Sequence, residues 1–288
     1  MGLDTLAADQ AVRFDQVVRH QGGFTLGPLD LRVPVGMVTG FVGPNGAGKT
    51  TAIKAMLSMV KISSGRIQVL GDGPGAHHDR IGVVLDTMSL PLDWTAWAAA
   101  TNLARFYPTW DQPGFTDLLD RLDVPRDVKV KDLSRGQGVK LQLALALAHR
   151  PELLILDEPT SGLDPVARLE VLDIFREFML DEHHTILFST HITSDLERIA
   201  DYLHLIGNGQ TCYAGLLAEL GEEWGIARGP ADAFSPAARE ALVGARSTSG
   251  GALEGLVRLD DSARFGPQVL IEAPALDEAV AALTRKER

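Results

Sequence analysis

A glycine-rich segment with a lysine and a threonine has the spacing of a phosphate-binding loop. Residues 43–50 read GPNGAGKT and fit the pattern G-x-x-x-x-G-K-[ST]. Glycines let backbone N–H groups turn toward phosphate oxygens, and a helix that begins there directs its positive end at the same anion. Lys49 can reach the β- and γ-phosphates of a nucleotide, and the Thr50 hydroxyl can bind Mg²⁺. The predicted phosphate-binding residues are Gly43, Asn45, Gly46, Ala47, Gly48, Lys49, Thr50 and Thr51.

Two adjacent carboxylates follow an apolar run. Residues 153–158 read LLILDE, which predicts a buried strand with Asp157 and Glu158 at its carboxyl end, where α/β sheets bind ligands. Asp157 would hold Mg²⁺, directly or through water, and Glu158 would polarise the attacking water as general base. A solvated acidic strand end is the alternative, and a chance glycine turn is the alternative for the loop. The presence of both motifs in one chain disfavours each alternative.

Two further positions could face the same anion. Residues 134–137, SRGQ, stand just before the apolar run 139–148, and a serine and a glycine at a helix N-terminus form an anion-binding arrangement. Taken alone, Ser134 is better explained as a simple N-cap. His191 follows a predicted strand at residues 185–189. A lone histidine is more often structural, but this one closes a strand near the same sheet edge, which points to a γ-phosphate contact.

These residues require a sheet that brings strand ends together. Apolar runs and alternation predict strands within residues 11–42 and at 65–70, 81–85, 153–156 and 185–189. Helical spacing predicts helices at 49–60, 166–180 and 192–200, and a mostly helical region over about 93–150. Residues 202–206 and 210–214 read as a hairpin around the GNG of residues 207–209.

The composition changes after about residue 221. Gly, Ala, Ser and Pro become more frequent, and the STSGG of residues 247–251 indicates a loop or linker. A strand at 269–272 and a helix at 275–283 are predicted beyond it. We therefore expect a main domain over residues 11–220 and a small C-terminal α/β appendage over residues 221–288.

Composition limits the classes of partner. The 288 residues include 27 basic and 38 acidic side chains, a net charge of −11, and no basic patch is concentrated along the chain, so nucleic acid is not an expected partner. The single cysteine, Cys212, cannot form an internal disulfide. Residues 1–10 do not resemble a secretory signal, and no apolar run approaches the roughly 20 residues that span a bilayer. We expect a cytoplasmic protein.

The ordered motifs resemble the ABC ATPase family. Over about residues 12–220 they occur as the phosphate loop, LSRGQ at 133–137, LLILDEP at 153–159, SGLD at 161–164, and then His191. The resemblance implies an α/β P-loop NTPase fold with a RecA-like core, an antiparallel β subdomain and a helical subdomain over about residues 90–150. Within the family the chain is similar to single-domain bacterial subunits of the drug- and peptide-exporter type.

The resemblance also implies a mechanism that uses ATP and Mg²⁺. Two copies, in a homodimer or in a heterodimer with a related subunit, would sandwich each ATP between Lys49 of one copy and Ser134, Gly136 and Gln137 of the other. Glu158, His191 and Lys49 would be catalytic, and Asp164 would lie at the dimer seam. Hydrolysis would drive a separate membrane permease, which would hold the chain on the inner face of the cell membrane.

Three positions depart from the family pattern. Asp86 stands where glutamine is usual, and a shorter, anionic side chain must bind Mg²⁺ or water differently; Thr50, Asp86 and Asp157 are the predicted metal residues. Gln21 aligns with the usual adenine-stacking aromatic, which leaves Phe14 or Phe24 as other candidates for stacking. Arg135 replaces the usual glycine of LSGGQ and adds a charge near the partner's phosphate site.

Aromatic residues of the helical region bear on the permease contact. The family places this contact in the stretch that holds Trp94, Trp97, Phe106, Tyr107 and Trp110, although packing inside the subdomain explains most of them. Two other functions compete with transport. An ABC ATPase of DNA repair or translation would typically add coiled coils, zinc motifs or a second cassette, and none is visible. A nucleotide-binding regulator without turnover would not need Glu158 and His191.

Overall fold

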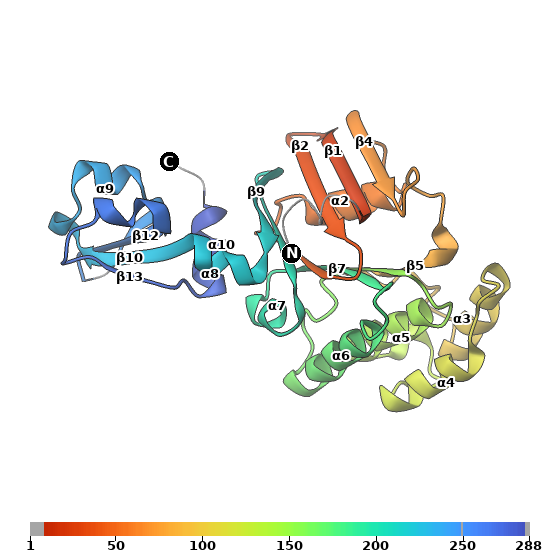
Figure 1. Ribbon diagram of the computed structural model, residues 1–288. Coiled ribbons are helices and arrows are strands. Elements are labelled where there is room, and N and C mark those ends of the chain that lie inside the picture. The colour runs from red at the N-terminus through yellow and green to blue at the C-terminus, as the bar shows by residue number, and fades with distance from the viewer. Residues whose placement is uncertain (1–8, 249, 286–288) are drawn as a thin grey trace.

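The computed structural model describes residues 9–248 and 250–285, and its centre is a six-stranded sheet (Figure 1). The strand order is β5-β6-β7-β3-β8-β9, in which all neighbours are parallel except the antiparallel pair β8 and β9. The strands are β3 (Val38–Val42), β5 (Ile81–Val84), β6 (Leu153–Asp157), β7 (Thr185–Thr190), β8 (Tyr202–Gly207) and β9 (Gln210–Leu216). The central strands are nearly continuous apolar runs because both faces of the sheet are covered.

A three-stranded antiparallel sheet covers one face. It has the order β2-β1-β4 and consists of β1 (Gln10–Gln21), β2 (Phe24–Pro34) and β4 (Ser64–Val69). Helix α2 (Lys49–Met56) lies beside it (Figure 1). Leu153 and Ile155 of β6 share one buried cluster with residues of α2 and of this small sheet.

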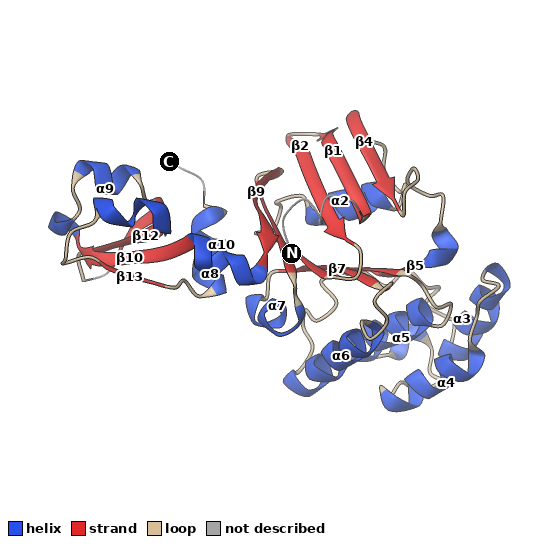
Figure 2. Cartoon of the chain, viewed as in Figure 1, coloured by secondary structure: helices blue, strands red, loops and turns tan. Residues whose placement is uncertain are grey.

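Helices cover the opposite face of the central sheet (Figure 2). They are α3 (Ala96–Leu103), α4 (Gln112–Arg121), α5 (Arg135–Leu147), α6 (Pro165–Phe178) and α7 (Thr193–Ile199). Leu154 and Leu156 of β6 pack into this second cluster, as the two-residue alternation of a strand requires. Four of these helices begin at a side-chain cap, which accepts a backbone N–H of the first turn: Thr95, Asp111, Ser134 and Asp164.

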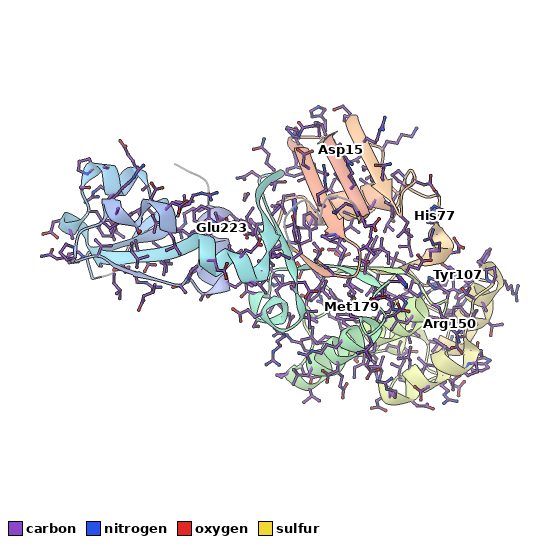
Figure 3. The ribbon with its side chains drawn as sticks, viewed as in Figure 1. Asp15, His77, Tyr107, Arg150, Met179 and Glu223 are labelled. Atoms are coloured by element: carbon purple, nitrogen blue, oxygen red, sulfur yellow. The ribbon has the colours of Figure 1, made fainter. Side chains whose placement is uncertain are left out.

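The residues that follow β9 form a third sheet, the C-terminal sheet, on the far side of β9 (Figure 1). Its strand order is β11-β12-β10-β13, all antiparallel. Its elements are α8 (Leu217–Glu223), β10 (Trp224–Pro230), α9 (Pro236–Glu240), β11 (Val243–Ser247), β12 (Ala252–Arg258), β13 (Leu270–Glu272) and α10 (Leu276–Leu283). Glu223, labelled in Figure 3, marks the junction, and α10 packs back against α7 and β8.

The structure also contains short 3-10 helices of one or two turns. They are η1 (His78–Arg80), η2 (Ala104–Phe106), η3 (Val130–Asp132), η4 (Ala231–Ala233) and η5 (Leu259–Arg264). None of the helices within residues 9–248 and 250–285 combines the length and apolar character needed to cross a bilayer.

The predicted strands of the main sheet and the hairpin at residues 207–209 are confirmed within a residue or two. The helix predicted over residues 49–60 ends early, at Met56, because Leu57 leaves helical geometry and Ser58 has a φ of +58°. The strands β10, β11 and β12 and the helices α8 and α9 were not predicted from sequence. Ser249 of the predicted loop, and residues 1–8 and 286–288, lie outside the described residues.

Candidate functional site

The phosphate-loop residues join β3 to α2 at the carboxyl end of the central sheet. A Cβ on Gly43 would lie 2.1 Å from the carbonyl oxygen of Ile206, so no larger residue fits there. Gly48 has a φ of +111°, and a Cβ on it would lie 2.7 Å from Leu26 Cδ1. Gly48 is also the N-cap of α2 and brings no capping side chain, so the positive end of the helix faces the loop.

Three side chains meet behind this loop. Lys49 is 6% exposed, and its Nζ donates to the carbonyl oxygen of Gly43 at 2.7 Å and lies 3.6 Å from Glu158 Oε1. The other carboxylate oxygen of Glu158, Oε2, lies 2.7 Å from His191 Nδ1, which therefore donates to it. The general base predicted from sequence thus stands between a cation and an imidazole, and each of these partners orients one carboxylate oxygen.

The backbone of Glu158 is in an uncommon conformation. Its φ is +53°, in the left-handed region, which costs on the order of 1–3 kcal/mol for a residue other than glycine. Two hydrogen bonds hold it there: Glu158 N donates to Ser189 O at 2.9 Å, and Ser161 N donates to Glu158 O at 3.1 Å. One bond comes from the neighbouring strand β7 and the other closes the turn after β6, so the structure around the site holds this conformation.

Asp157 fits a cation ligand. It is fully buried, and neither carboxylate oxygen makes a hydrogen bond of good geometry to another described residue. Burial raises the pKa of Asp157, while the nearby hydroxyls of Thr50 and Ser189 act in the opposite direction and the charge of Asp86 adds to the rise. A buried carboxyl group of this kind, beside a threonine hydroxyl, suits a divalent cation, whose charge would stabilise the carboxylate.

The remaining ligands of such a cation would not come from a protein cage. Within the described part of the chain, no group of three or more His, Cys, Asp or Glu side chains could hold a metal ion. Mg²⁺ typically keeps several waters and binds through one or two protein oxygens together with substrate phosphates. Thr50 and Asp157 fit that arrangement, and the exposed Asp86 lines the same cavity, where its charge acts on Asp157.

A cavity of about 630 Å³ opens over these residues, a volume that suits a nucleotide-sized ligand. Most of the site residues predicted from sequence line it: Asn45, Gly46, Ala47, Gly48, Lys49, Thr50, Thr51, Asp86, Glu158 and His191. Gly43 and Asp157 are buried and do not line the cavity. Ser134, Gly136 and Gln137 do not line it either.

The cavity also contains residues that sequence analysis treated as uncertain. Gln21 and Phe24 line it together, whereas Phe14 is fully buried and cannot stack on a base. Phe24 lies on β2 directly against Gly48: a Cβ there would come within 3.2 Å of Phe24 Cζ. Phe24 is therefore the aromatic side chain available to a base. Ser161, which the analysis of single residues missed, also lines the cavity.

The SRGQ segment lies at the start of α5. Ser134 Oγ accepts from Gln137 N at 3.2 Å, and Gln137 Oε1 accepts from Ser134 N at 3.1 Å, a reciprocal cap. Ser134 is thus the N-cap of α5, as the simpler interpretation of the sequence predicted. Arg135 differs, because it lines the cavity of its own chain and packs on Gly162, where an added Cβ would lie 3.1 Å from Arg135 Nε.

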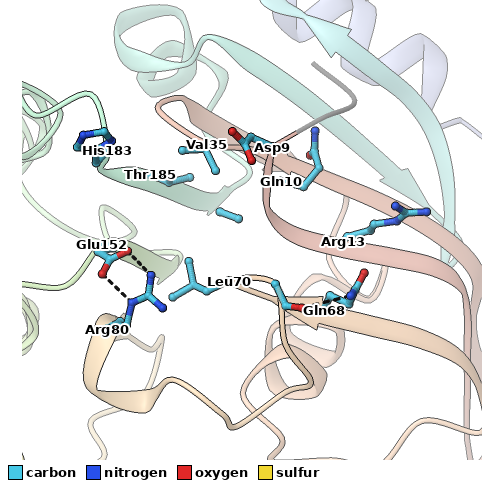
Figure 4. Close-up of a pocket in the computed structure, with 12 residues that line it drawn as sticks. Asp9, Gln10, Arg13, Val35, Gln68, Leu70, Arg80, Glu152, His183 and Thr185 are labelled. Carbon is cyan, nitrogen blue, oxygen red and sulfur yellow. Dashed lines mark hydrogen bonds and ion pairs between the residues drawn. The ribbon is translucent and has the colours of Figure 1, made fainter. Parts of the chain in front are cut away.

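A second cavity, of about 380 Å³, lies at the opposite ends of the same strands (Figure 4). Figure 4 shows the Arg80 guanidinium paired with Glu152. Arg80 Nε donates to Glu152 Oε1 at 2.6 Å, and Nη2 donates to Oε2 at 2.5 Å. The hydroxyl of Thr185, at the start of β7, accepts from Gly36 N at 3.1 Å. These polar groups are satisfied within the protein, and ligands of open α/β sheets bind at the carboxyl ends of strands. The phosphate-loop cavity is therefore the candidate site.

Comparison with known proteins identifies the family of the chain. The sequence profile of the family described as ABC transporter matches residues 26–161. The Nod factor export ATP-binding protein I of Rhizobium johnstonii is 36% identical over 213 residues, which cover 71% of this chain and 68% of that protein. The chain belongs to the ABC transporter family. A solved ATP-binding subunit of an ABC transporter has the same fold, with a TM-score of 0.67 and 25% identity over 74% of this chain and 92% of that one.

Other curated relatives of this ABC protein are longer than the region of similarity. The bacitracin transport ATP-binding protein BcrA of Bacillus licheniformis is 32% identical, and the match covers 63% of this chain and 61% of BcrA. The chain spans about three fifths of the length of the first curated relatives it matches. The similarity establishes the ABC ATPase fold, in agreement with the α/β P-loop class predicted from sequence.

Proposed function

We propose that this ABC protein binds ATP with Mg²⁺ and hydrolyses it to ADP and phosphate. Hydrolysis would power a separate membrane permease, which we propose to be an exporter. The observation that carries the proposal is the convergence of Lys49, Glu158 and His191 on one cavity, with distances of 3.6 and 2.7 Å between partners. A protein that only bound nucleotide as a signal would not need a carboxylate held in this way.

Each residue then has a defined chemical task. Backbone N–H groups of residues 43–51 would hold the phosphates, and Lys49 would exchange its contact with Gly43 O for the β- and γ-phosphates. Thr50 and Asp157 would hold Mg²⁺, which neutralises charge on the phosphates. Glu158 would accept a proton from the attacking water, while His191 orients its carboxylate and contacts the γ-phosphate.

We infer that two ATPase copies complete each site, in a homodimer or with a related subunit. Ser134 is exposed, and neither Ser134 nor Gly136 nor Gln137 lines the cavity of its own chain. Their helix N-terminus is therefore available to the phosphate of a second copy. The 161–164 segment lies beside this helix, because Arg135 packs on Gly162, so both segments would lie at the same seam.

The permease would dock on the helical side of the sheet edge. An apolar cavity of about 190 Å³ lies between β5 and the helices, and its lining includes Leu85, Leu90, Leu103 and Tyr107. Leu85 directly precedes Asp86 of the nucleotide cavity, so one short segment joins the two sites. This contact would place the chain on the cytoplasmic face of the membrane. The net charge of −11 disfavours nucleic acid as a main partner.

The Glu158→Gln variant tests the proposal. Glutamine keeps the shape of the side chain but cannot act as a base, and general bases contribute roughly 10²–10⁴ to rate. We expect ATP binding to persist, ATP hydrolysis to fall at least about 100-fold, and Mg-ATP to shift the full-length chain from monomer to dimer in light scattering. Ligand shared between two copies stabilises their dimer by mass action.

Two controls separate the parts of this proposal. Ser134→Arg in the Glu158→Gln chain should abolish the ATP-dependent dimer but keep the fold, because it adds bulk where the partner's γ-phosphate must lie. Lys49→Ala should weaken both binding and turnover. Wild-type protein that binds ATP without hydrolysing it would reject the enzymatic role, and a Glu158→Gln chain that stays monomeric even with its permease would reject the two-copy arrangement.

A further inference from the structure

A fully buried carboxylate lies behind the site but outside the nucleotide cavity. Asp195 is 0% exposed and belongs to the first turn of α7, four residues after His191. It does not line the cavity over the phosphate loop. A charge buried to this extent persists only where hydrogen bonds and an opposite charge offset the loss of water.

Asp195 satisfies both of its oxygens with side chains from other segments. Oδ2 accepts from the hydroxyl of Thr160 at 2.7 Å, and Thr160 is itself 1% exposed. Oδ1 accepts from Nε of Arg168, on α6. The same guanidinium donates through Nη2 to Ser194 Oγ at 2.8 Å, so Arg168 holds the first turn of α7 at two points.

The Thr160–Asp195 contact is the second of two side-chain contacts between the same two segments. Thr160 follows Glu158 by two residues at the end of β6, and Asp195 follows His191 at the end of β7. The first link is the 2.7 Å contact between Glu158 Oε2 and His191 Nδ1. Two strand-end segments tied at two successive points form a closed ring, in which a change at one link displaces the other.

We propose that Asp195 is a positioning residue that, through Thr160 and Arg168, sets the distance between Glu158 and His191. The inference rests on the proposed ATP hydrolysis, since it assigns a part of that same site. Asp195 touches neither the cavity nor the predicted phosphate position, so its effect must pass through the ring. Arg168 extends the ring to α6, whose N-cap is Asp164 of the predicted dimer seam.

The matched pair Thr160→Val and Thr160→Ser tests the inference on the full chain. Valine keeps the shape of threonine but removes the hydroxyl, whereas serine keeps the hydroxyl. Misplacing a catalytic group by about 1 Å can cost about 100-fold in rate, so we expect Thr160→Val to lower kcat for ATP hydrolysis at least about tenfold with the Kd for ATP unchanged. Thr160→Ser should retain most of the wild-type rate.

A second background separates positioning from general destabilisation. If the ring acts through His191, Thr160→Val should change the residual rate by less than about twofold in a His191→Ala chain, since effects within one unit are not additive. A merely structural role would lower the rate equally in both backgrounds, and that result would overturn the inference. A wild-type kcat in Thr160→Val would overturn it as well.

A crystal structure of Thr160→Val keeps this question apart from the proposed function. An intact 2.7 Å contact between Glu158 and His191 would overturn the inference, and a separated pair would support it, whether or not the chain hydrolyses ATP. A wild-type chain that lacks ATPase activity would overturn the proposed function alone. Asp195→Asn, which weakens the ion pair with Arg168 and keeps the volume, should separate the same two side chains.

Discussion

At the scale of single residues, Phe24 decides how the site would hold a base. Gln21 occupies the position where sequence alignment places the usual aromatic, but both side chains line the cavity, and only Phe24 offers a ring. Every base has a π-face, so stacking on Phe24 holds adenine and guanine alike. ATP and GTP also carry the same triphosphate, so neither the stacking nor the phosphate contacts would distinguish them.

The Phe24→Ala variant should therefore weaken both ATP and GTP. Base stacking is worth about 1–3 kcal/mol per base, which corresponds to about 5- to 150-fold in Kd. We expect wild-type Kd values for ATP and GTP within about tenfold of each other, and a parallel loss of both in Phe24→Ala, as measured by titration calorimetry. Gln21→Ala serves as the matched control. A large loss in Gln21→Ala with none in Phe24→Ala would assign base binding to Gln21.

At the scale of elements, the helical side presents its aromatic residues unequally. Trp94 and Trp110 pack against the buried cluster, as the core explanation of these residues requires. Phe106, on the short helix η2, is 75% exposed, and Trp97 on α3 is 46% exposed. Leu92, ahead of α3, is 60% exposed. These exposed apolar side chains extend the surface on which the permease is proposed to dock.

The Phe106→Asp variant tests this surface. A charge at an exposed position leaves the core intact, so the melting temperature of the isolated subunit should stay unchanged, while co-purification with the permease from the native host should be lost. Leu180→Asp is the matched control, because Leu180 is 86% exposed and lies after α6, away from the proposed surface. Equal loss of permease in both variants would show that the effect is not specific to η2.

The same elements show how much could be predicted from sequence. The strands of the central sheet were predicted because they are apolar on both faces and end at motifs with recognisable chemistry. The strand β10 reads WGIARGP, with little strand propensity, and was missed. Its neighbour β12 and the helix α10 hold it through long-range contacts, such as the ion pairs of Arg228 with Glu254 and Glu278. Contacts of this range leave no local pattern.

The site divides in the same way. The loop, the paired acids and His191 could be predicted because each motif carries its own chemistry. Thr160 and Asp195 are 35 positions apart in the sequence, and no sequence pattern around either residue predicts contact with the other. Phe24 was only one of two aromatic candidates until burial excluded Phe14. The motifs therefore predict which residues form the site, whereas the contacts between distant segments are known only from the three-dimensional structure.

At the scale of the whole molecule, the C-terminal residues share a core with the central sheet and its helices. One buried cluster contains Leu196 of α7 and Leu203 of β8 together with Trp224, Leu256 and Ala279 from the C-terminal sheet and α10. The appendage predicted over residues 221–288 is thus packed on the helix that follows His191. A shared core predicts cooperative unfolding, in which the two parts melt together.

Lysine substitutions on α10 test that coupling. Ala279 is fully buried in the shared cluster, whereas Ala281, on the same helix, is exposed. An unpaired charge in a core costs on the order of 2 kcal/mol or more, so Ala279→Lys should lower the melting temperature of the entire chain, and Ala281→Lys should not. Calorimetry should show one transition in both variants, with loss of ATP binding at the same temperature. Two transitions, of which Ala279→Lys moves only the smaller, would show instead that the C-terminal sheet folds as an independent unit.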